Sequence, residues 1–171
     1  LSTKGGESIT AFLLSELRSA SLSNSFAVAV SGGIDSMALL HASHLVACER
    51  NIELHAFHVH HGLQAEADGW VEFVQAFCID KHIHFSHVQL DPCTRKNAQS
   101  IEDWARQGRY AALASMAQSN QVACILLAQH EDDQIETHLL QKARGAGVRG
   151  QAAMPAEFQR FNTIWRRPWL E

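Results

Sequence analysis

The chain has 171 residues, of which 46% are hydrophobic and 19% charged, with a formal net charge of −4. This composition supports a packed domain and argues against wholesale disorder. No apolar run approaches the roughly 20 residues needed to cross a bilayer, and residues 1–8 contain no hydrophobic export signal.

Apolar runs and helix-like patterns alternate along the chain. They predict helices over residues 11–22, 37–48, 66–78, 100–117 and 133–143, and strands over residues 26–30, 53–59, 83–90, 122–128 and 163–165. Ser100, with Asp103 three residues later, resembles a capping box. The alternation predicts an α/β fold, a doubly wound parallel sheet of about five strands with helices on both faces. Ligands bind such sheets beyond the carboxyl ends of the strands, here residues 31–36, 58–63, 91–98 and 129–136.

The cysteines and the charge distribution bear on compartment and partners. The four cysteines are dispersed, without a CxxC pair, at Cys48, Cys78, Cys93 and Cys124. Dispersed cysteines without an export signal predict reduced thiols in the cytoplasm. Residues 1–141 hold 8 basic and 16 acidic side chains, whereas residues 142–171 hold 6 basic and 2 acidic ones. The basic end favours a surface that meets phosphate, with a solvated tail as an equally weighted alternative.

The segment Ser31–Ser36, with the letters SGGIDS, is the strongest local signal. Adjacent glycines let backbone N–H groups converge, the serines add hydroxyl groups, and the predicted helix that follows presents its positive end, so the segment predicts a phosphate site. It is neither a Walker A loop nor a GxGxxG fingerprint, and the alternative is a tight turn that needs glycine only for geometry. Asp35 would repel phosphate unless Mg²⁺ lay between them, although it could simply serve the helix dipole.

Two further charged clusters lie on predicted helices. Asp132, Asp133 and Glu136 share a helix face, where like charges cost stability unless a cation or a basic ligand neutralises them; a polar helix face is the alternative. Arg106 could reach a triphosphate or its transition state, or could instead pair with Glu102 on the surface.

Histidines crowd the end of the strand predicted over residues 53–59. His58 and His61 lie at the ligand edge of the sheet and are expected to contact nucleotide or substrate. His58 and His60 could share a metal ion, but no neighbouring cysteine or HExxH pattern supports this. The glycine- and arginine-rich residues 144–150 predict a flexible loop.

In this order, the strings resemble the PP-loop superfamily of N-type ATP pyrophosphatases and, within it, the tRNA(Ile)-lysidine synthetases. The resemblance is carried by SGGIDS at 31–36, HVHHGL at 58–63, IEDWARQGRY at 101–110, HEDDQIET at 130–137, RGAGVRG at 144–150 and RRPWL at 166–170. It departs from the family pattern at Gln64, where an arginine is usual, and at Trp169.

The resemblance implies an adenine nucleotide alpha hydrolase-like fold and an ATP-dependent ligase. Such an enzyme adenylates the C2 carbonyl oxygen of the wobble cytidine in an isoleucine tRNA with a CAU anticodon, and free L-lysine then displaces AMP to give lysidine. The implied ATP-binding residues are Ser31, Gly32, Gly33, Ile34, Asp35, Ser36 and His58. The implied catalytic residues are Asp35, which would also hold Mg²⁺, Arg106, Asp133 and Glu136. The implied contacts to lysine or tRNA are His61, Arg109, Asp132, Arg144 and Arg149.

Residues 1–171 are expected to form the catalytic domain alone, because members of the resembled family continue into helical tRNA-binding domains. Three alternatives remain: a PP-loop thiolase, a small-molecule amidating ligase and a noncatalytic nucleotide-binding module. The missing CxxC pair argues against a thiolase that holds an iron–sulfur cluster. The string at 144–150 argues against the amidating ligase, and the paired acids argue against a passive binder.

Overall fold

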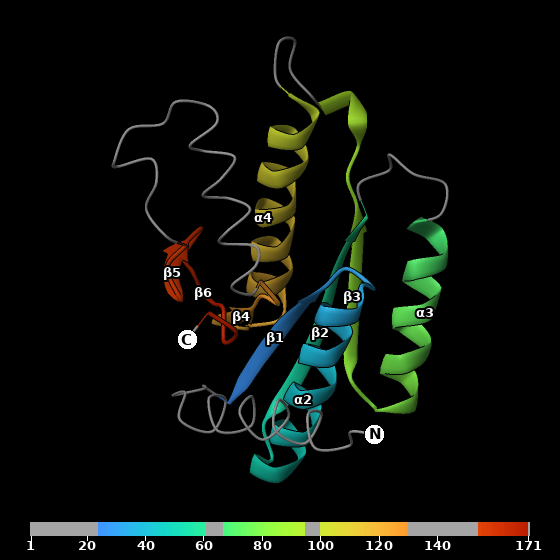
Figure 1. Cartoon of the computed structure of the whole chain (residues 1–171), viewed down its shortest axis with the longest axis vertical. Coiled ribbons are helices and arrows are strands. Elements are labelled where there is room, and N and C mark those ends of the chain that lie inside the picture. The colour runs from blue at the N-terminus through green and yellow to red at the C-terminus, as the bar shows by residue number, and fades with distance from the viewer. Residues whose placement is uncertain (1–23, 61–66, 95–99, 130–153, 171) are drawn as a thin grey trace, which may run out of the picture.

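The computed structural model describes residues 24–60, 67–94, 100–129 and 154–170. The elements in chain order, shown in Figure 1, are β1 (Ser25–Val30), α2 (Ile34–Arg50), β2 (Glu53–His60), α3 (Ala67–Asp80), β3 (His84–Gln89), a short 3-10 helix (Pro92–Thr94), α4 (Ile101–Ser119), β4 (Cys124–Leu126), β5 (Glu157–Arg160) and β6 (Thr163–Arg166). The helices expected over residues 11–22 and 133–143 lie outside the described residues.

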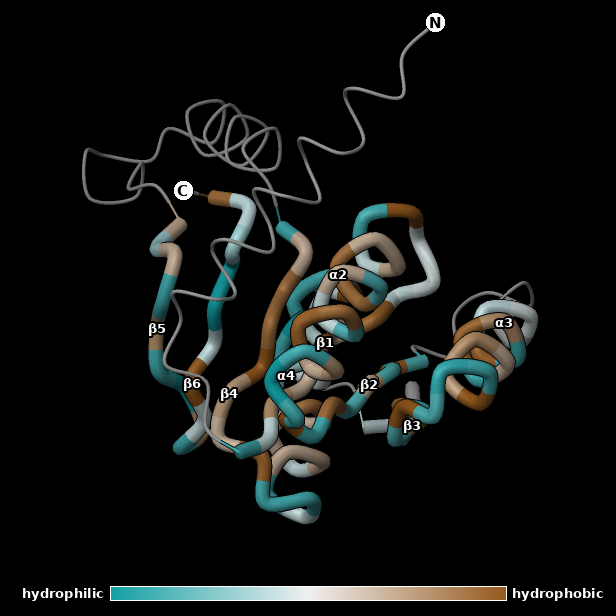
Figure 2. Tube along the Cα trace, turned by 90° about the horizontal axis from the view of Figure 1, so that it is seen from below, coloured by the Kyte–Doolittle hydropathy of each residue, from teal (hydrophilic) through white to brown (hydrophobic). Residues whose placement is uncertain are grey.

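One mixed sheet of six strands, in the order β3-β2-β1-β4-β6-β5, forms the centre of the fold. Each neighbouring pair is parallel except β5 and β6, which are antiparallel. The expected doubly wound α/β fold is confirmed, with β5 as an additional strand at the edge. Figure 2 shows this edge as mostly hydrophilic, and the residues of β5 alternate between exposed and half-buried positions.

Helices cover both faces of the sheet, as expected. On one face, Leu39 and Val46 of α2 and Val74 of α3 pack against β1 and β2 in a single buried cluster. On the other face, Leu113 of α4 belongs to a second cluster that includes Trp165 of β6. Continuous apolar runs such as β1 follow from this arrangement, because a strand between two helical layers buries both of its faces.

The ends of α2 and α4 follow from short-range chemistry. The Ser100 hydroxyl accepts a hydrogen bond from the Asp103 N–H at 3.1 Å, which confirms the predicted cap at the start of α4. Asn51 ends α2 in a left-handed conformation, with its N–H bonded to the Ala47 carbonyl. Asparagine tolerates this conformation better than most residues, so the turn into β2 is fixed locally.

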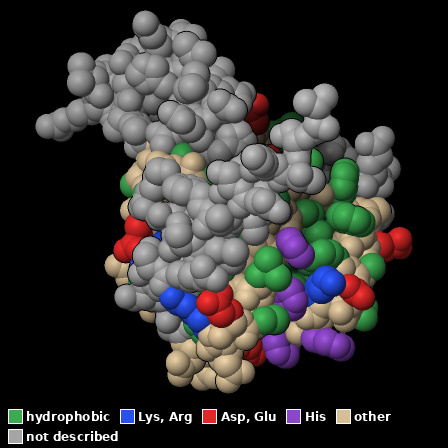
Figure 3. Space-filling model, turned by 60° about the horizontal axis from the view of Figure 1, so that its bottom comes forward, with side chains coloured by type: hydrophobic (Ala, Val, Ile, Leu, Met, Phe, Trp, Pro, Cys, Tyr) green, Lys and Arg blue, Asp and Glu red, His purple; other side chains and the backbone are tan. Residues whose placement is uncertain are grey.

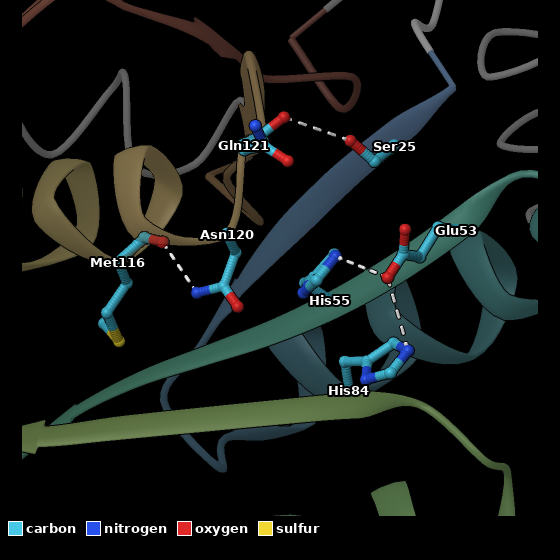
Figure 4. A network of polar contacts seen from close by, with 7 residues as sticks. All are labelled: Ser25, Glu53, His55, His84, Met116, Asn120 and Gln121. Carbon is cyan, nitrogen blue, oxygen red and sulfur yellow. Dashed lines mark hydrogen bonds and ion pairs between the residues drawn. The ribbon is translucent and has the colours of Figure 1, made fainter.

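A histidine network lies at the amino ends of β2 and β3 (Figure 4). Glu53 Oε1 lies 3.3 Å from Nε2 of His55 and 3.3 Å from Nε2 of His84. The His55 ring is buried and stacks on His84, its partner in the β2–β3 register. Burial lowers the pKa of His55, although Glu53 opposes this effect. The network is therefore at the opposite end of the strands from the carboxyl edge.

The surface mixes histidine with apolar side chains. Figure 3 shows one face on which histidine side chains adjoin hydrophobic ones. Large hydrophobic side chains of α3 are exposed in the described structure, namely Trp70, Phe73 and Ile79. None of the described helices combines the length and the apolar character that a membrane span requires.

Candidate functional site

A cavity of about 570 Å³ opens at the carboxyl ends of the parallel strands β1, β2 and β4. Its lining residues come from β1 and the following loop, β2, α3, α4 and the end of β4: Ala29, Val30, Ser31, Gly33, Asp35, Ser36, Phe57, His58, Val59, His60, Trp70, Arg109, Tyr110, Leu113, Leu127, Ala128 and Gln129. Of the segments expected at the ligand edge, the lining includes Ser31, Gly33, Asp35 and Ser36, then His58 and His60, and Gln129, whereas Gly32, Ile34 and the described residues 91–94 lie outside it. The carboxyl edge is the position at which open α/β sheets bind ligands.

Hydrogen bonds within the segment Ser31–Ser36 give the loop its shape. The Ser36 hydroxyl accepts from the Ser31 N–H at 3.1 Å and donates to the Gly33 carbonyl at 2.9 Å. The two serine hydroxyl oxygens lie 3.1 Å apart, and the Gly33 N–H donates to the Ser31 hydroxyl at 3.3 Å. Gly32 adopts φ +92°, a conformation that other residues rarely reach. The two serines therefore stabilise the loop through internal hydrogen bonds and also line the cavity.

The loop leads directly into the positive end of α2. Gly33 is the N-cap in an extended conformation and makes no side-chain cap hydrogen bond. A helix start without a capping side chain offers N–H groups and a positive partial charge to an anion. Asp35 lies exposed in the first turn, on the cavity wall next to this positive end. A carboxylate oxygen is the kind of ligand that a divalent cation such as Mg²⁺ takes, so Asp35 could hold such an ion.

His58 is a buried, neutral side chain in the floor of the cavity. Its Nδ1 donates to the Val30 carbonyl at 2.9 Å, which leaves Nε2 as an acceptor. Burial lowers the pKa of His58, with His60 and His87 acting in the same direction and the bond to Val30 opposing them. His58 thus joins β2 to the end of β1, the strand that leads into the loop.

The arginines of α4 differ in their relation to the cavity. Both Arg106 and Arg109 are exposed, but only Arg109 is among the residues that line the cavity. Desolvation lowers the pKa of the Arg109 guanidinium, and neighbouring Arg106 adds to the effect. Arg109 remains cationic at neutral pH. Arg109 is therefore the α4 cation that faces the cavity in this structure.

Arg167, to which the sequence interpretation assigned no role, contacts two residues of the cavity wall. Its side chain is only 4% exposed, and it donates to the side chain of Gln129, to the Pro155 carbonyl at 2.7 Å and to the Tyr110 hydroxyl at 3.5 Å. Its guanidinium also stacks over Phe158, 4.4 Å from the ring centre. Gln129 and Tyr110 both line the cavity, so Arg167 supports two of its walls from behind.

Trp70 was also missed, although it lines the cavity from α3. Residues 58–63, which precede α3, were expected at the ligand edge. A tryptophan in the helix that follows them was therefore the one sequence feature that could have pointed to this contact. Six residues that the sequence interpretation assigned to the site lie outside the described residues: His61, Asp132, Asp133, Glu136, Arg144 and Arg149.

The cysteines bear on the alternative of thiol chemistry. Cys78 and Cys124 are buried, and burial raises the pKa of each thiol to about 11. Cys48 and Cys93 are exposed. All four belong to the described part of the chain, within which no three His, Cys, Asp or Glu side chains are grouped to hold a metal ion. The described residues thus offer no cysteine set for an iron–sulfur cluster.

Comparison with known proteins places this site in a family. A model of the PP-loop domain matches residues 7–171. The chain is 46% identical over 144 residues to a tRNA(Ile)-lysidine synthase of Polaromonas naphthalenivorans, covering 84% of this chain and 42% of that protein. It is 42% identical over 170 residues to a tRNA(Ile)-lysidine synthase of Pseudomonas syringae pv. tomato, covering 99% and 37%. The chain thus spans less than half the length of these relatives.

A solved structure shares the fold at low sequence identity. The U34-tRNA thiolase NcsA from Methanococcus maripaludis, solved with its [4Fe-4S] cluster, matches 95% of this chain and 58% of its own, with a TM-score of 0.73 and 16% identity. At that identity the likeness concerns the fold alone. The family match over residues 7–171, together with the loop at the carboxyl edge of the sheet, shows that the chain belongs to the PP-loop family.

Proposed function

We propose that this chain carries out the ATP-dependent chemistry of a tRNA(Ile)-lysidine synthase. The α-phosphorus of ATP is attacked by the C2 carbonyl oxygen of the wobble cytidine in an isoleucine tRNA with a CAU anticodon, and pyrophosphate leaves. The amine of free L-lysine then attacks C2, AMP leaves, and a carbon–nitrogen bond remains. The similarity to two named lysidine synthases supports this proposal, and the main structural support is the cavity beside the loop 31–36.

The phosphate chain of ATP is assigned to the segment Ser31–Ser36. The uncapped start of α2, the glycines and the serine hydroxyls supply donors and positive potential on one side of the cavity. Mg²⁺ is proposed at Asp35, where it would neutralise the charge that forms on the departing pyrophosphate. The side chain of Arg109 faces the same cavity and can stabilise negative charge there, while Arg106 would have to reach in from outside the lining.

The nucleoside part of ATP is assigned to the apolar wall. Phe57, Leu113 and Leu127 line the cavity from β2, α4 and the segment after β4, and they can cover a base and a ribose. His58 presents an acceptor nitrogen, because its Nδ1 donates to Val30. A hydroxyl or an amino group of the nucleoside can donate to that nitrogen.

Lysine and tRNA are assigned to residues beyond the described part of the chain. The side chain of free lysine is an ammonium ion at neutral pH, with a pKa of roughly 10.4, so it must lose a proton before its amine attacks. Among Asp132, Asp133 and Glu136, one carboxylate can hold the ammonium group and another can accept the proton. His61, Arg144 and Arg149 are proposed to contact tRNA or lysine. The reaction, with its tRNA substrate, belongs in the cytoplasm.

The test is product analysis with the Asp35→Ala variant. Wild-type protein should release AMP only when tRNA and lysine are both present, because AMP leaves in the lysine step, whereas pyrophosphate release should require tRNA. Asp35→Ala should lower this turnover at least about 100-fold, the scale on which a phosphate clamp acts, and should leave the melting temperature within about 2 °C because the side chain is exposed.

The matched control is Asp80→Ala, an exposed aspartate on α3 that pairs with Lys81 outside the cavity. This variant should retain wild-type turnover. Release of ADP, or release of AMP that does not depend on lysine, would contradict the proposed reaction. Wild-type turnover by the folded Asp35→Ala protein would contradict the proposed metal site.

A further inference from the structure

The indole of Trp70 lies directly against the backbone of the loop after β1. A Cβ atom built on Gly32 would lie 2.6 Å from Cε3 of Trp70 and 3.0 Å from its Cδ2. Real side chains do not approach this closely, so glycine at this position is required by the tryptophan as well as by φ +92°. In the sequence, Gly32 precedes β2 and Trp70 follows it, so only the folded structure brings them together.

Burial in the core does not account for Trp70. Its side chain remains 46% exposed, and it makes an edge-to-face contact with Phe73, which is itself exposed. It lines the cavity together with Ser31, Gly33 and Asp35. Trp70 is therefore an exposed aromatic side chain that lies against the loop and lines the cavity.

We propose that Trp70 is a positioning residue for nucleotide binding: its ring holds Gly32 in place, so that the donors of the segment Ser31–Ser36 converge before the phosphate chain arrives. This inference rests on the proposed binding of ATP in the cavity. A loop that is ordered in advance binds its ligand more tightly, because the entropy of ordering it is not lost on binding. The hydrogen bonds of Ser36 fix the end of the loop next to α2, and Trp70 fixes its middle.

The first test compares single variants by calorimetric titration with ATP·Mg²⁺ and with inorganic pyrophosphate. Trp70→Ala should weaken both affinities about tenfold, which corresponds to the entropy of ordering about one residue. Trp70→Phe should stay within about threefold of wild type, because phenylalanine keeps counterparts of the Cβ, Cδ2 and Cε3 atoms that face Gly32. Ile79→Ala is the matched control, since Ile79 is exposed on the same helix and lies outside the cavity lining.

The second test is a double-mutant cycle between Gly32 and Trp70. Gly32→Ala alone should lose most affinity, because the added Cβ meets the indole. Removal of the indole should relieve part of that loss, so Gly32→Ala combined with Trp70→Ala should bind at least about fivefold better than the two single effects predict when added. Effects that simply add would overturn the proposal.

The outcomes separate this inference from the proposed function. If wild-type protein binds neither ATP nor pyrophosphate, both are overturned. If wild type binds and Trp70→Ala binds equally well, only the positioning role is overturned. Thermal denaturation is measured for every variant. If Trp70→Ala does not fold, the positioning role is tested with the folded Trp70→Phe protein and with the double variant Gly32→Ala plus Trp70→Phe. A tenfold loss of affinity in Trp70→Phe would count against the role.

Discussion

Replacement of Ser36 by alanine removes the hydroxyl that joins the loop after β1 to the first turn of α2. In the folded protein this side chain is 5% exposed, accepts from the Ser31 N–H at 3.1 Å and donates to the Gly33 carbonyl at 2.9 Å. The substitution deletes both bonds and the contact with the Ser31 hydroxyl oxygen at 3.1 Å. A hydrogen bond contributes about 0.5–1.5 kcal/mol net, and a donor left buried without a partner costs about 1–3 kcal/mol.

The expected loss of unfolding free energy lies in the lower part of the range of about 1–3 kcal/mol. Ser31 is exposed, so water can reach its N–H once the hydroxyl is gone, whereas Ser36 itself is buried. A loss of about 1–2 kcal/mol follows. For a domain of this size, each kcal/mol lowers the melting temperature by about 2–4 °C, so Ser36→Ala should melt about 2–8 °C below wild type.

Circular dichroism melts and ATP titration provide the assay. Ser115→Ala is the matched control, because Ser115 is exposed on α4 and lies outside the cavity lining; its effect should stay within about 0.5 kcal/mol. Ser36→Ala should also bind ATP more weakly than this control. A melting temperature within about 1 °C of wild type, with unchanged ATP affinity, would refute the idea that the hydroxyl shapes the loop.

Two further predictions concern titratable groups. Burial lowers the pKa of His55 and of His58 below the ordinary value of about 6.5, so the unfolded chain takes up protons first, and the free energy of unfolding should fall as pH decreases from about 6.5 through the lowered values. Urea denaturation at several pH values measures this, with His58→Gln expected to reduce the slope. Burial raises the thiol pKa of Cys78 and of Cys124 to about 11, so both should react with iodoacetamide at pH 8 much more slowly than the two exposed cysteines.

The same experiments contain the contrary outcomes. An unfolding free energy that stays constant between about pH 7 and pH 5.5, or a slope that His58→Gln leaves unchanged, would argue against a neutral buried His58. Equal modification rates at all four cysteines in the folded protein would argue against the burial of Cys78 and Cys124. Peptide mapping after brief labelling identifies the modified sites.

The order of the central elements could be predicted because their sequence patterns are strong. A strand covered on both faces, such as β1, has a continuous apolar sequence. Ser100, as an N-cap residue, predicts the start of α4. The strand β5 was missed because its four residues, from Glu157 to Arg160, alternate between exposed and half-buried positions at the edge of the sheet. Pairing with β6 makes it a strand, and no short-range pattern reports that pairing.

The site was predictable where it follows from chain order and not where it depends on packing. The segment Ser31–Ser36 could be placed at the carboxyl edge because it follows an apolar strand. Arg106 and Arg109 are three residues apart on one helix, and the sequence could not tell which faces the cavity, because the packing of Leu113 and its neighbours sets the rotation of α4. Contacts made only in the folded state, such as Trp70 on Gly32, leave no local pattern.

The burial of Arg167 changes what the basic end of the chain can offer to a polyanion. Its donors are engaged by Gln129, Pro155 and Tyr110, and only 4% of its side chain reaches solvent. A guanidinium in that position displaces no condensed counterions from RNA, so a count of basic residues in the sequence overstates by one the charges available for phosphate contact. Because each such contact changes the slope of log affinity against log salt by about 0.7–0.9, the salt dependence of the proposed RNA binding should be shallower by that amount than a count of basic residues predicts. The charge of Arg167 acts inward instead, as a fixed positive potential behind the wall formed by Gln129 and Tyr110.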